Sequence, residues 1–187
     1  MLRVLICDDH PIFREGLKKT LSFAPDLRVV GEAGTVAELF QLLGRTPCDV
    51  LILDITLPDR NGLEVLKQLQ AEGRGPAAIV LSMHTEEQYA VRAIRAGARG
   101  YLEKAGVPDE LIAALHKVAG GGVYVSPSLA ERLARELSGQ TEKPPHEALS
   151  NREYQILRML AAGRGGKQIA VELKLRPTTV ATYRRRI

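Results

Sequence analysis

The stretch Leu2-Arg3-Val4-Leu5-Ile6-Cys7-Asp8-Asp9 decides the fold of this chain, together with Val50-Leu51-Ile52-Leu53-Asp54. Short runs of branched apolar residues such as these are typical of parallel strands that helices cover on both faces. An open parallel sheet binds its ligands beyond the carboxyl ends of its strands. If the two strands are neighbours, three carboxylates meet in one crevice. There they either raise the pKa of one acid or hold a hard cation such as Mg²⁺.

The first two-thirds of the chain repeats this pattern, since apolar runs alternate with amphipathic stretches of helical period. We expect strands at 2–7, 27–33, 50–53, 78–81 and 100–102. We expect helices at 11–22, 36–43, 62–72, 86–96 and 108–119. Five successive β/α units predict an α/β fold in which helices cover both faces of a five-stranded parallel sheet.

The alternation ends at Gly120-Gly121-Gly122, so we expect the first domain to cover residues 1–122. The segment 123–149 has the composition of a linker, with Pro144-Pro145 inside it, and contains one expected helix at about 126–138. Ser126 and Pro127 are typical of the start of such a helix. A second domain would then cover residues 150–187.

Residues 150–187 carry the signals of a small all-α domain. Ser150 and Glu153 form a capping box ahead of an apolar pattern of helical period. Glycines at 163–166 end that helix, and residues 167–173 fit a short second one. Pro177 is suited to start a third helix that runs to about residue 186. Two short helices joined by a tight turn, the second of them basic, predict a helix-turn-helix.

Charge is unevenly distributed along the 187 residues, whose net charge is +4. Residues 1–125 carry 14 Lys and Arg against 16 Asp and Glu, whereas residues 148–187 carry 9 against 2. A small basic module on a mildly acidic body indicates a polyanionic partner, most often nucleic acid, although a solubilising tail is the alternative. No apolar run has the length of a membrane span, and the first residues lack the architecture of a signal peptide. We therefore expect a cytoplasmic protein with no membrane partner.

Asp54 is the residue on which we expect the chemistry to depend. A carboxylate at the end of a strand can act as a nucleophile and form an aspartyl-phosphate. Phosphoryl transfer requires mainly positioning and neutralisation of charge. Asp8 and Asp9 would hold Mg²⁺, while Lys104 and the hydroxyl of Ser82 would bind phosphoryl oxygens. The alternative is that the acids cap helices or lie in loops, which is usual for any one of them alone. Five such residues at four strand ends favour a site.

Four motifs occur together in this chain: Ile6-Cys7-Asp8-Asp9-His10, Asp54-Ile55-Thr56-Leu57-Pro58-Asp59-Arg60-Asn61-Gly62-Leu63-Glu64, Leu81-Ser82 and Gly100-Tyr101-Leu102-Glu103-Lys104. The chain thereby resembles bacterial two-component response regulators of the NarL/FixJ (LuxR-type) family, over nearly its whole length. The resemblance implies that residues 1–122 form a receiver domain of flavodoxin-like fold, with sheet order 2-1-3-4-5. It also implies that Asp54 is the phosphoacceptor and that the donor is a phosphohistidine of a sensor histidine kinase.

The resemblance further implies how the site would work. Asp9, Asp54 and the backbone carbonyl of Thr56 would coordinate Mg²⁺ directly, and Asp8 would support the ion through water. Ser82 and Lys104 match the family's switch hydroxyl and its phosphate-binding lysine.

Tyr101 matches the family's switch aromatic. When Ser82 moves toward the phosphoryl group it vacates space that Tyr101 would fill, so a local change of charge would bias a two-state element. An ordinary strand aromatic is the alternative for Tyr101.

The tail resembles the LuxR-type helix-turn-helix through Leu149-Ser150-Asn151-Arg152-Glu153, Lys167-Gln168-Ile169-Ala170 and Thr178-Thr179-Val180. The resemblance implies that a recognition helix enters the major groove of double-stranded DNA at promoter sites. Side chains that would face the bases are Ala181, Thr182 and Arg185. Phosphate contacts are expected from Lys167, Arg184 and Arg186, and the same interface would include Thr178 and Thr179. For any one of these arginines, a solvated basic face is the alternative.

The tail also departs from the family's pattern. Ala181 and Tyr183 stand where the family commonly has lysine and histidine, and Arg176 stands where it has a capping serine. Gly165-Gly166 replaces the usual polar pair and should loosen the start of the scaffold helix. The family's pattern continues beyond Ile187, so we expect the DNA-binding domain of residues 150–187 to be incomplete at its C-terminus. A frayed end and weakened DNA binding should follow.

We therefore expect a DNA-binding response regulator rather than a turnover enzyme. Phosphorylation of Asp54 would release the helix-turn-helix and favour a homodimer. One alternative is a receiver-based protein-interaction module whose degenerate tail does not bind DNA. Another is a phosphatase with an aspartyl-phosphate intermediate, similar to haloacid-dehalogenase enzymes. Those enzymes have a second acid two residues after the nucleophile. This chain has Thr56 at that position, which argues against a phosphatase.

Overall fold

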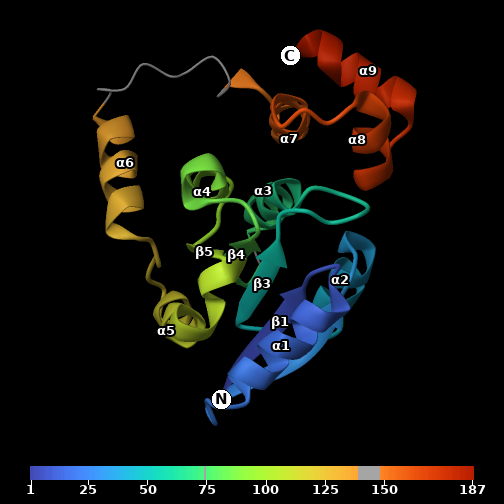
Figure 1. Ribbon diagram of the computed structural model, residues 1–187. Coiled ribbons are helices and arrows are strands. Elements are labelled where there is room, and N and C mark those ends of the chain that lie inside the picture. The colour runs from blue at the N-terminus through green and yellow to red at the C-terminus, as the bar shows by residue number, and fades with distance from the viewer. Residues whose placement is uncertain (74, 139–147) are drawn as a thin grey trace. The chain divides into compact units, whose positions relative to one another are not determined.

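A computed structural model describes residues 1–73, 75–138 and 148–187 of the chain (Figure 1). The chain divides into two compact units, Met1–Ser138 and Gly139–Ile187. Among the described residues, no helix combines the length and the apolar character that crossing a membrane requires.

The first unit is built on a five-stranded parallel sheet with the order β2-β1-β3-β4-β5. The strands are β1 (Leu2–Cys7), β2 (Leu27–Ala33), β3 (Val50–Asp54), β4 (Ala77–Ser82) and β5 (Gly100–Glu103). This confirms the expected α/β fold and sheet order. The strands β3, β4 and β5 each extend at least one residue further than expected, so that Asp54 and Ser82 are the last residues of their strands rather than the first residues after them.

Helices cover both faces of this sheet. They are α1 (Pro11–Leu21), α2 (Val36–Leu43), α3 (Gly62–Glu72), α4 (Glu86–Arg95) and α5 (Val107–Ala119), with a 3₁₀ turn, η1, at Lys104–Gly106. Crossovers between parallel strands are right-handed. The step from β1 to β2 runs opposite to the later steps, so α1 lies on one face and α2, α3 and α4 lie on the other (Figure 1).

The core on the α1 and α5 face shows why alternate strand residues are apolar. Val4, Ile6, Ile52 and Ile79 point to this face and are at most 1% exposed, and they pack against Leu17 of α1 and Leu111 of α5. Burial of a side chain of this size contributes about 1.5–3 kcal/mol relative to leaving it exposed. Because the residues between them are buried on the opposite face, the strands are apolar throughout, as central parallel strands usually are.

The segment after α5 belongs to the first unit. The backbone N–H of Tyr124 donates to the carbonyl of Arg99 over 2.7 Å, and Tyr124 pairs with Gly100 on the outer edge of β5. Helix α6 (Pro127–Leu137) follows, and Arg95 of α4 pairs with its Glu136 over 2.7 Å. The compact unit consequently ends at Ser138, past the boundary expected at 122. Pro144-Pro145 of the expected linker lies outside the described residues.

The second unit contains three helices among its described residues: α7 (Asn151–Ala161), α8 (Gly166–Glu172) and α9 (Pro177–Arg186). The predicted capping box is present, since Ser150 Oγ accepts from the backbone N–H of Glu153 and the Glu153 carboxylate accepts from the N–H of Ser150. A small core of five buried residues joins the helices: Ile156, Ile169, Ala170, Leu173 and Val180. These helices match the expected ranges closely.

Candidate functional site

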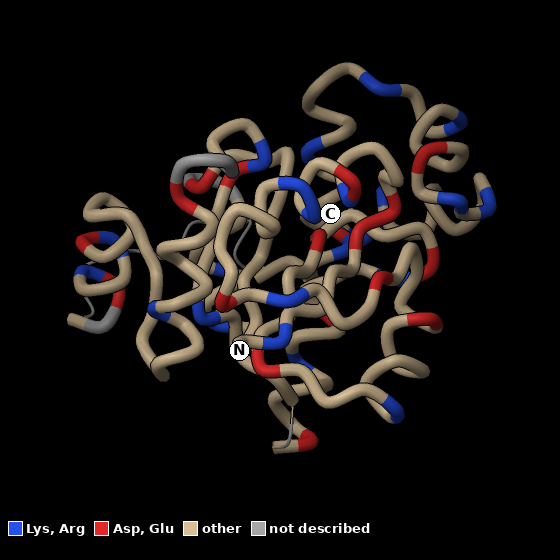
Figure 2. Tube along the Cα trace, turned by 90° about the horizontal axis from the view of Figure 1, so that it is seen from below, with Lys and Arg blue, Asp and Glu red and all other residues tan. Residues whose placement is uncertain are grey.

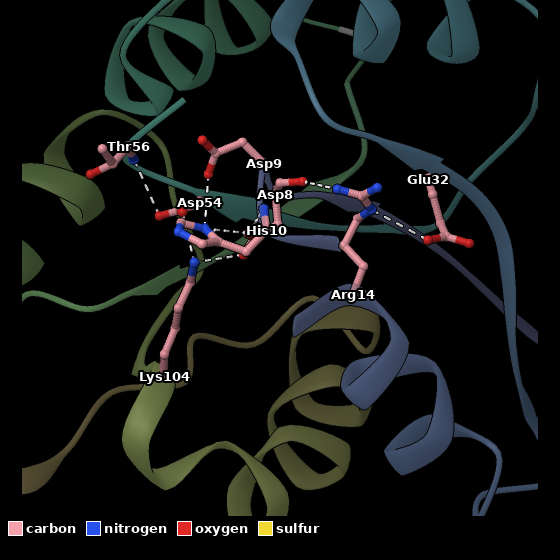
Figure 3. Close-up of polar contacts among 8 residues, drawn as sticks. All are labelled: Asp8, Asp9, His10, Arg14, Glu32, Asp54, Thr56 and Lys104. Carbon is pink, nitrogen blue, oxygen red and sulfur yellow. Dashed lines mark hydrogen bonds and ion pairs between the residues drawn. The ribbon is translucent and has the colours of Figure 1, made fainter. Parts of the chain in front are cut away.

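The strand order brings the predicted site residues together at the carboxyl edge of the sheet (Figure 3). Asp8 follows β1, Asp54 ends the neighbouring β3, Ser82 ends β4, and Lys104 follows the edge strand β5. All four side chains are buried, which is unusual for acids and lysines and requires that they be paired. The structure thereby brings these four positions to one edge of the sheet, while their roles stay a prediction.

Lys104 is the cation that pairs the two buried acids. Its Nζ lies 2.7 Å from Oδ2 of Asp54 and 2.6 Å from Oδ2 of Asp8, and it sits 4.7 Å from the centre of the Phe13 ring. Burial alone would lower the pKa of Lys104. The charges and hydrogen bonds of Asp54 and Asp8 outweigh burial and raise the pKa above its ordinary value. Lys104 is therefore held protonated beside the acid that the sequence singles out.

Asp54 has an unusual protonation equilibrium. Burial raises its pKa to about 6, opposed by Lys104 and by the backbone N–H of Thr56, and Asp8 adds to the rise. The Thr56 N–H donates to Oδ1 of Asp54 over 3.2 Å, while Oδ2 faces Lys104. Both carboxylate oxygens are therefore held in fixed directions. The three acids do not cap helices, since the N-cap positions of α1 and α3 are His10 and Asn61.

His10 is a member of this cluster that sequence reasoning missed, although it stands in one of the quoted motifs. Its Nδ1 lies 2.8 Å from Oδ1 of Asp9 and 3.2 Å from Oδ1 of Asp8 (Figure 3). The Asp8 oxygen also accepts the backbone N–H of His10, so a tight turn holds the imidazole against both acids. No periodic pattern signals such a contact, because it depends on the local turn after β1.

The donor set of the site fits a hard divalent cation. One ligand atom each from Asp8, Asp9, His10 and Asp54 lies within 4.8 Å of all the others. Carboxylate oxygens are the ligands that Mg²⁺ prefers, and oxygen donors from Asp8, Asp9 and Asp54 suffice to begin its octahedral shell. The residues present thus fit Mg²⁺, while the direct ligands among them stay a prediction.

The loop that presents Asp54 and Thr56 is fixed by two residues of the same motif. A Cβ on Gly62 would collide with the carbonyl oxygen of Asp54, so only glycine lets the start of α3 approach the strand this closely. Asp59 accepts from the backbone N–H groups of Val36 and Ala37, at 3.0 and 3.1 Å, and thereby ties the loop to the start of α2. This use of Asp59 could not be read from its place in the motif.

Ser82 and Tyr101 meet at the loop between β4 and α4. Ser82 Oγ accepts from the backbone N–H of His84 over 3.1 Å, and the Tyr101 hydroxyl donates to the His84 carbonyl over 2.7 Å. Tyr101 is 2% exposed, and burial raises the pKa of its hydroxyl above the ordinary value. The aromatic side chain is therefore buried and bound to the same residue as the predicted switch hydroxyl. Whether it exchanges with an outward rotamer stays a prediction.

The contacts continue from this loop to α6, which no sequence signal indicated. The backbone N–H of Glu86, the first residue of α4, donates to the Glu103 carboxylate over 2.8 Å. The Glu86 carboxylate in turn accepts from the hydroxyls of Ser126 and Ser128, at 2.5 and 3.0 Å. Ser126 is the N-cap of α6. The start of α4 is thus linked to the start of α6.

The third helix of the second unit carries the predicted nucleic-acid contacts. Val180 is buried and Tyr183 packs against the small core, so one side of α9 faces the unit. Residues predicted to face bases, Ala181, Thr182 and Arg185, are exposed. The predicted contacts Thr178, Arg184, Arg186 and Lys167 are exposed as well, whereas Thr179 is partly buried. Figure 2 marks the basic residues near the C label, where α9 ends in Arg184, Arg185 and Arg186.

The structure shows the surroundings of three of the departures noted in the sequence. Tyr183 serves the core of the second unit. Gly165 lacks a capping side chain, but its backbone N–H donates to the Gln168 side chain over 3.0 Å, which satisfies one donor at the start of α8. Arg176 precedes α9 without a side-chain cap. The scaffold of the helix-turn-helix is therefore complete over the described part of the second unit.

Comparison with known proteins matches both units. Residues 4–116 match the response regulator receiver domain, and residues 147–187 match the bacterial regulatory proteins of the luxR family. The transcriptional regulatory protein UhpA of Salmonella typhimurium is 44% identical over 98% of this chain and 88% of its own length.

Solved structures give the same result. A LuxR-family two-component response regulator from Aurantimonas sp. SI85-9A1 has a TM-score of 0.65 at 32% identity, covering 73% of this chain and 97% of that one. The response regulator RcsB in a DNA complex also has a TM-score of 0.65, at 26% identity over 98% of this chain and 88% of that one. These matches confirm the resemblance that the motifs indicated.

Proposed function

Because this chain belongs to the bacterial response regulators that join a receiver domain to a luxR-family regulatory domain, we propose that it is a DNA-binding transcription regulator switched by phosphorylation of Asp54. The observation that carries the proposal is the buried contact of Lys104 with Asp54 and Asp8 at the carboxyl edge of the sheet. The contact supports the proposal because phosphoryl transfer to Asp54 would require a carboxylate beside a cation and further oxygen ligands.

In the proposed reaction, a carboxylate oxygen of Asp54 attacks the phosphorus of a phosphohistidine on a sensor histidine kinase. The O–P bond of an aspartyl-phosphate forms, the N–P bond breaks, and the kinase histidine leaves with the electron pair of that bond. Asp8, Asp9 and Asp54, with the backbone carbonyl of Thr56, would hold Mg²⁺, which supplies neutralisation of phosphoryl charge. The contact of Lys104 with Asp54 would be replaced by one with a phosphoryl oxygen. The chain receives and slowly loses this group, so it is not a turnover enzyme.

The readout of the reaction would start at Ser82. A phosphoryl oxygen would accept the hydroxyl hydrogen of Ser82 and draw this side chain away from the His84 N–H, which now donates to Ser82 Oγ over 3.1 Å. Loss of that contact shifts the loop to which Tyr101 is bound. Because Glu86 directly follows this loop as the first residue of α4 and accepts from Ser126 and Ser128, the change would reach α6 through contiguous hydrogen bonds.

The output would be exposure of the DNA-binding unit and formation of a homodimer. Phosphorylation can shift this equilibrium only as far as the phosphorylated site differs in energy between the two states. The exposed basic residues of α9 and Lys167 of α8 support double-stranded DNA at promoter sites as the partner. The described packing of α7, α8 and α9 around one core gives no support to a degenerate tail.

The proposal is tested with acetyl phosphate and Mg²⁺ as phosphodonor and cofactor. We expect a slower band on a phosphate-binding gel, a shift toward dimer in size-exclusion chromatography and tighter binding to DNA. Asp54→Asn should abolish all three responses. Asp26→Asn is the matched control, since Asp26 is an exposed acid that pairs with His116 away from the site. Dimerisation that persists in Asp54→Asn would contradict the proposed switch.

A further inference from the structure

The outward face of α9 has an unusual composition. Successive residues of an α-helix are separated by 100° around its axis, so positions i, i+3, i+4 and i+7 form one stripe. In α9 that stripe consists of Thr178, Ala181, Thr182 and Arg185, all exposed, and it lies opposite the buried Val180. We call these four residues the reading stripe. Arg184 and Arg186 lie on its two flanks.

The reading stripe has a restricted chemistry. It contains no Asn or Gln, which read adenine through two hydrogen bonds, and no Asp or Glu, which accept from cytosine. Its one long polar side chain is Arg185, which suits the O6 and N7 acceptors of guanine. Three short side chains remain, and Ala181 offers only a methyl group.

The methyl group of Thr182 is the part of its side chain left for contact with a base, because its hydroxyl hydrogen is used in a hydrogen bond within the helix. The Thr182 Oγ1 donates its hydrogen to the carbonyl of Thr178 over 3.0 Å, within the helix itself. A threonine bonded in this way has no hydroxyl hydrogen left for a base acceptor. Thr182 is exposed, and the remaining branch of its side chain is a methyl group. Ala181 and Thr182 therefore present two adjacent methyl groups on the exposed side of the helix.

We propose that the reading stripe selects DNA half-sites in which thymine C5-methyl groups contact Ala181 and Thr182, beside a guanine that Arg185 binds. Ala and Thr side chains recognise thymine through apolar contact between their methyl groups and its C5-methyl group. The rise of 1.5 Å per residue puts Arg185 about 6 Å along the helix from Ala181, roughly two base steps away. The inference rests on the proposed DNA-binding function and adds the sequence that it selects.

The test begins with selection of bound duplexes from random double-stranded DNA by the 187-residue chain, treated with acetyl phosphate and Mg²⁺. We expect selected sites to contain thymine within two base pairs of a guanine. Each thymine is then replaced by deoxyuridine, which keeps base pairing and removes only the methyl group. For a contacted thymine, affinity measured by fluorescence anisotropy should fall about three- to fivefold, the effect of one buried methyl group.

Three protein variants assign the effect to Thr182. Thr182→Ser removes the methyl and keeps the hydroxyl. At the thymine that Thr182 contacts, this variant should therefore bind the thymine duplex and the deoxyuridine duplex with equal affinity. Thr182→Val keeps a methyl and removes the hydroxyl, so it should retain the thymine preference. Arg184→Gln removes a flanking cation and should weaken binding to both duplexes by the same factor.

The outcomes separate the inference from the function on which it rests. Equal binding of thymine and deoxyuridine duplexes by the unmodified sequence would overturn the methyl readout and leave DNA binding intact. Loss of the preference in Thr182→Val with retention in Thr182→Ser would also overturn it, since the hydroxyl would then be the reader. If the phosphorylated chain selects no duplex at all, the proposed function and the inference both fail.

Discussion

The ammonium nitrogen of Lys104 lies 2.7 Å from the Oδ2 of Asp54, although fifty positions separate the two residues in the sequence. Both side chains are buried, and the same nitrogen lies 2.6 Å from Asp8. One cation therefore compensates two buried acids. This arrangement lets the site accept a further negative group only if another cation joins it, which couples phosphorylation to the metal ion.

Removal of Lys104 should leave the two buried acids uncompensated. We expect Lys104→Met to lower the free energy of unfolding of the first unit by about 3–5 kcal/mol at pH 7.5. The loss should shrink below pH 6, because Asp54, whose pKa burial raises to about 6, takes up a proton there. Urea unfolding at both pH values checks this. Addition of Asp54→Asn to Lys104→Met should restore part of the stability, and a deeper loss in the double variant would speak against the shared cation.

Gly62 sets how closely α3 approaches β3, the strand that ends at Asp54. Gly62→Ala should cost about 2 kcal/mol or more and abolish phosphorylation by acetyl phosphate, because the new Cβ would collide with the Asp54 carbonyl. Gly16→Ala in α1 is the control, since nothing lies within 4 Å of its added Cβ. That variant should be stabilised by about 0.5–1 kcal/mol and phosphorylated normally. Normal phosphorylation of Gly62→Ala would show that the close approach is dispensable.

Asp49 predicts a defined dependence of stability on pH. It accepts three hydrogen bonds from Arg3, which hold the pKa of its carboxyl at about 2, below the ordinary 3.8. A carboxyl whose pKa is lowered on folding stabilises the fold above its unfolded pKa and loses that effect as pH falls through the folded pKa. Asp49→Asn should therefore lower the melting temperature at pH 7 and approach the unmodified chain as pH falls from 4 toward 2.

The size of the Asp49 effect should be modest. The side chains of Arg3 and Asp49 are 43% and 35% exposed, so solvent screening should keep the effect on the free energy of unfolding small at pH 7. Arg3→Gln should give the same pH profile, and the double variant should lose no more than either single one. A melting-temperature difference that is constant from pH 2 to pH 7 would exclude this pair as its source.

Glu86 should control how firmly α6 is held. Glu86→Ala removes the acceptor of two hydroxyl groups at the start of α6, and we expect amide hydrogen exchange in residues 127–137 to accelerate about tenfold. Glu131→Ala, which changes an exposed acid on α6 itself, is the control and should leave exchange unchanged. Phosphorylation should accelerate exchange in the unmodified chain and have little further effect in Glu86→Ala. If phosphorylation accelerated exchange equally in the unmodified chain and in Glu86→Ala, the hydrogen bonds of Glu86 would not connect Asp54 to α6.

The amino-acid sequence was sufficient to predict the fold and to place the candidate site residues at the ends of their strands. Apolar runs with helical stretches between them predict a parallel sheet covered by helices, and in such a sheet the carboxyl ends of the strands bring Asp8, Asp54, Ser82 and Lys104 to one edge. Turn and cap residues located the helix ends within one or two positions, because these residues act on the nearest backbone groups.

Only the tertiary structure decided the contacts that connect this site to the rest of the chain. The pairing of Lys104 with both acids, the clamp of Asp59 on α2 and the contact of Glu86 with Ser126 each join residues far apart in the sequence. Polar contacts of this kind have no period and depend on single side-chain directions, so no pattern predicts them. The contacts of Glu86 with Ser126 and of Arg95 with Glu136 join α6 to α4, and for this reason the first unit extends to Ser138 and not to the glycine run at 120–122.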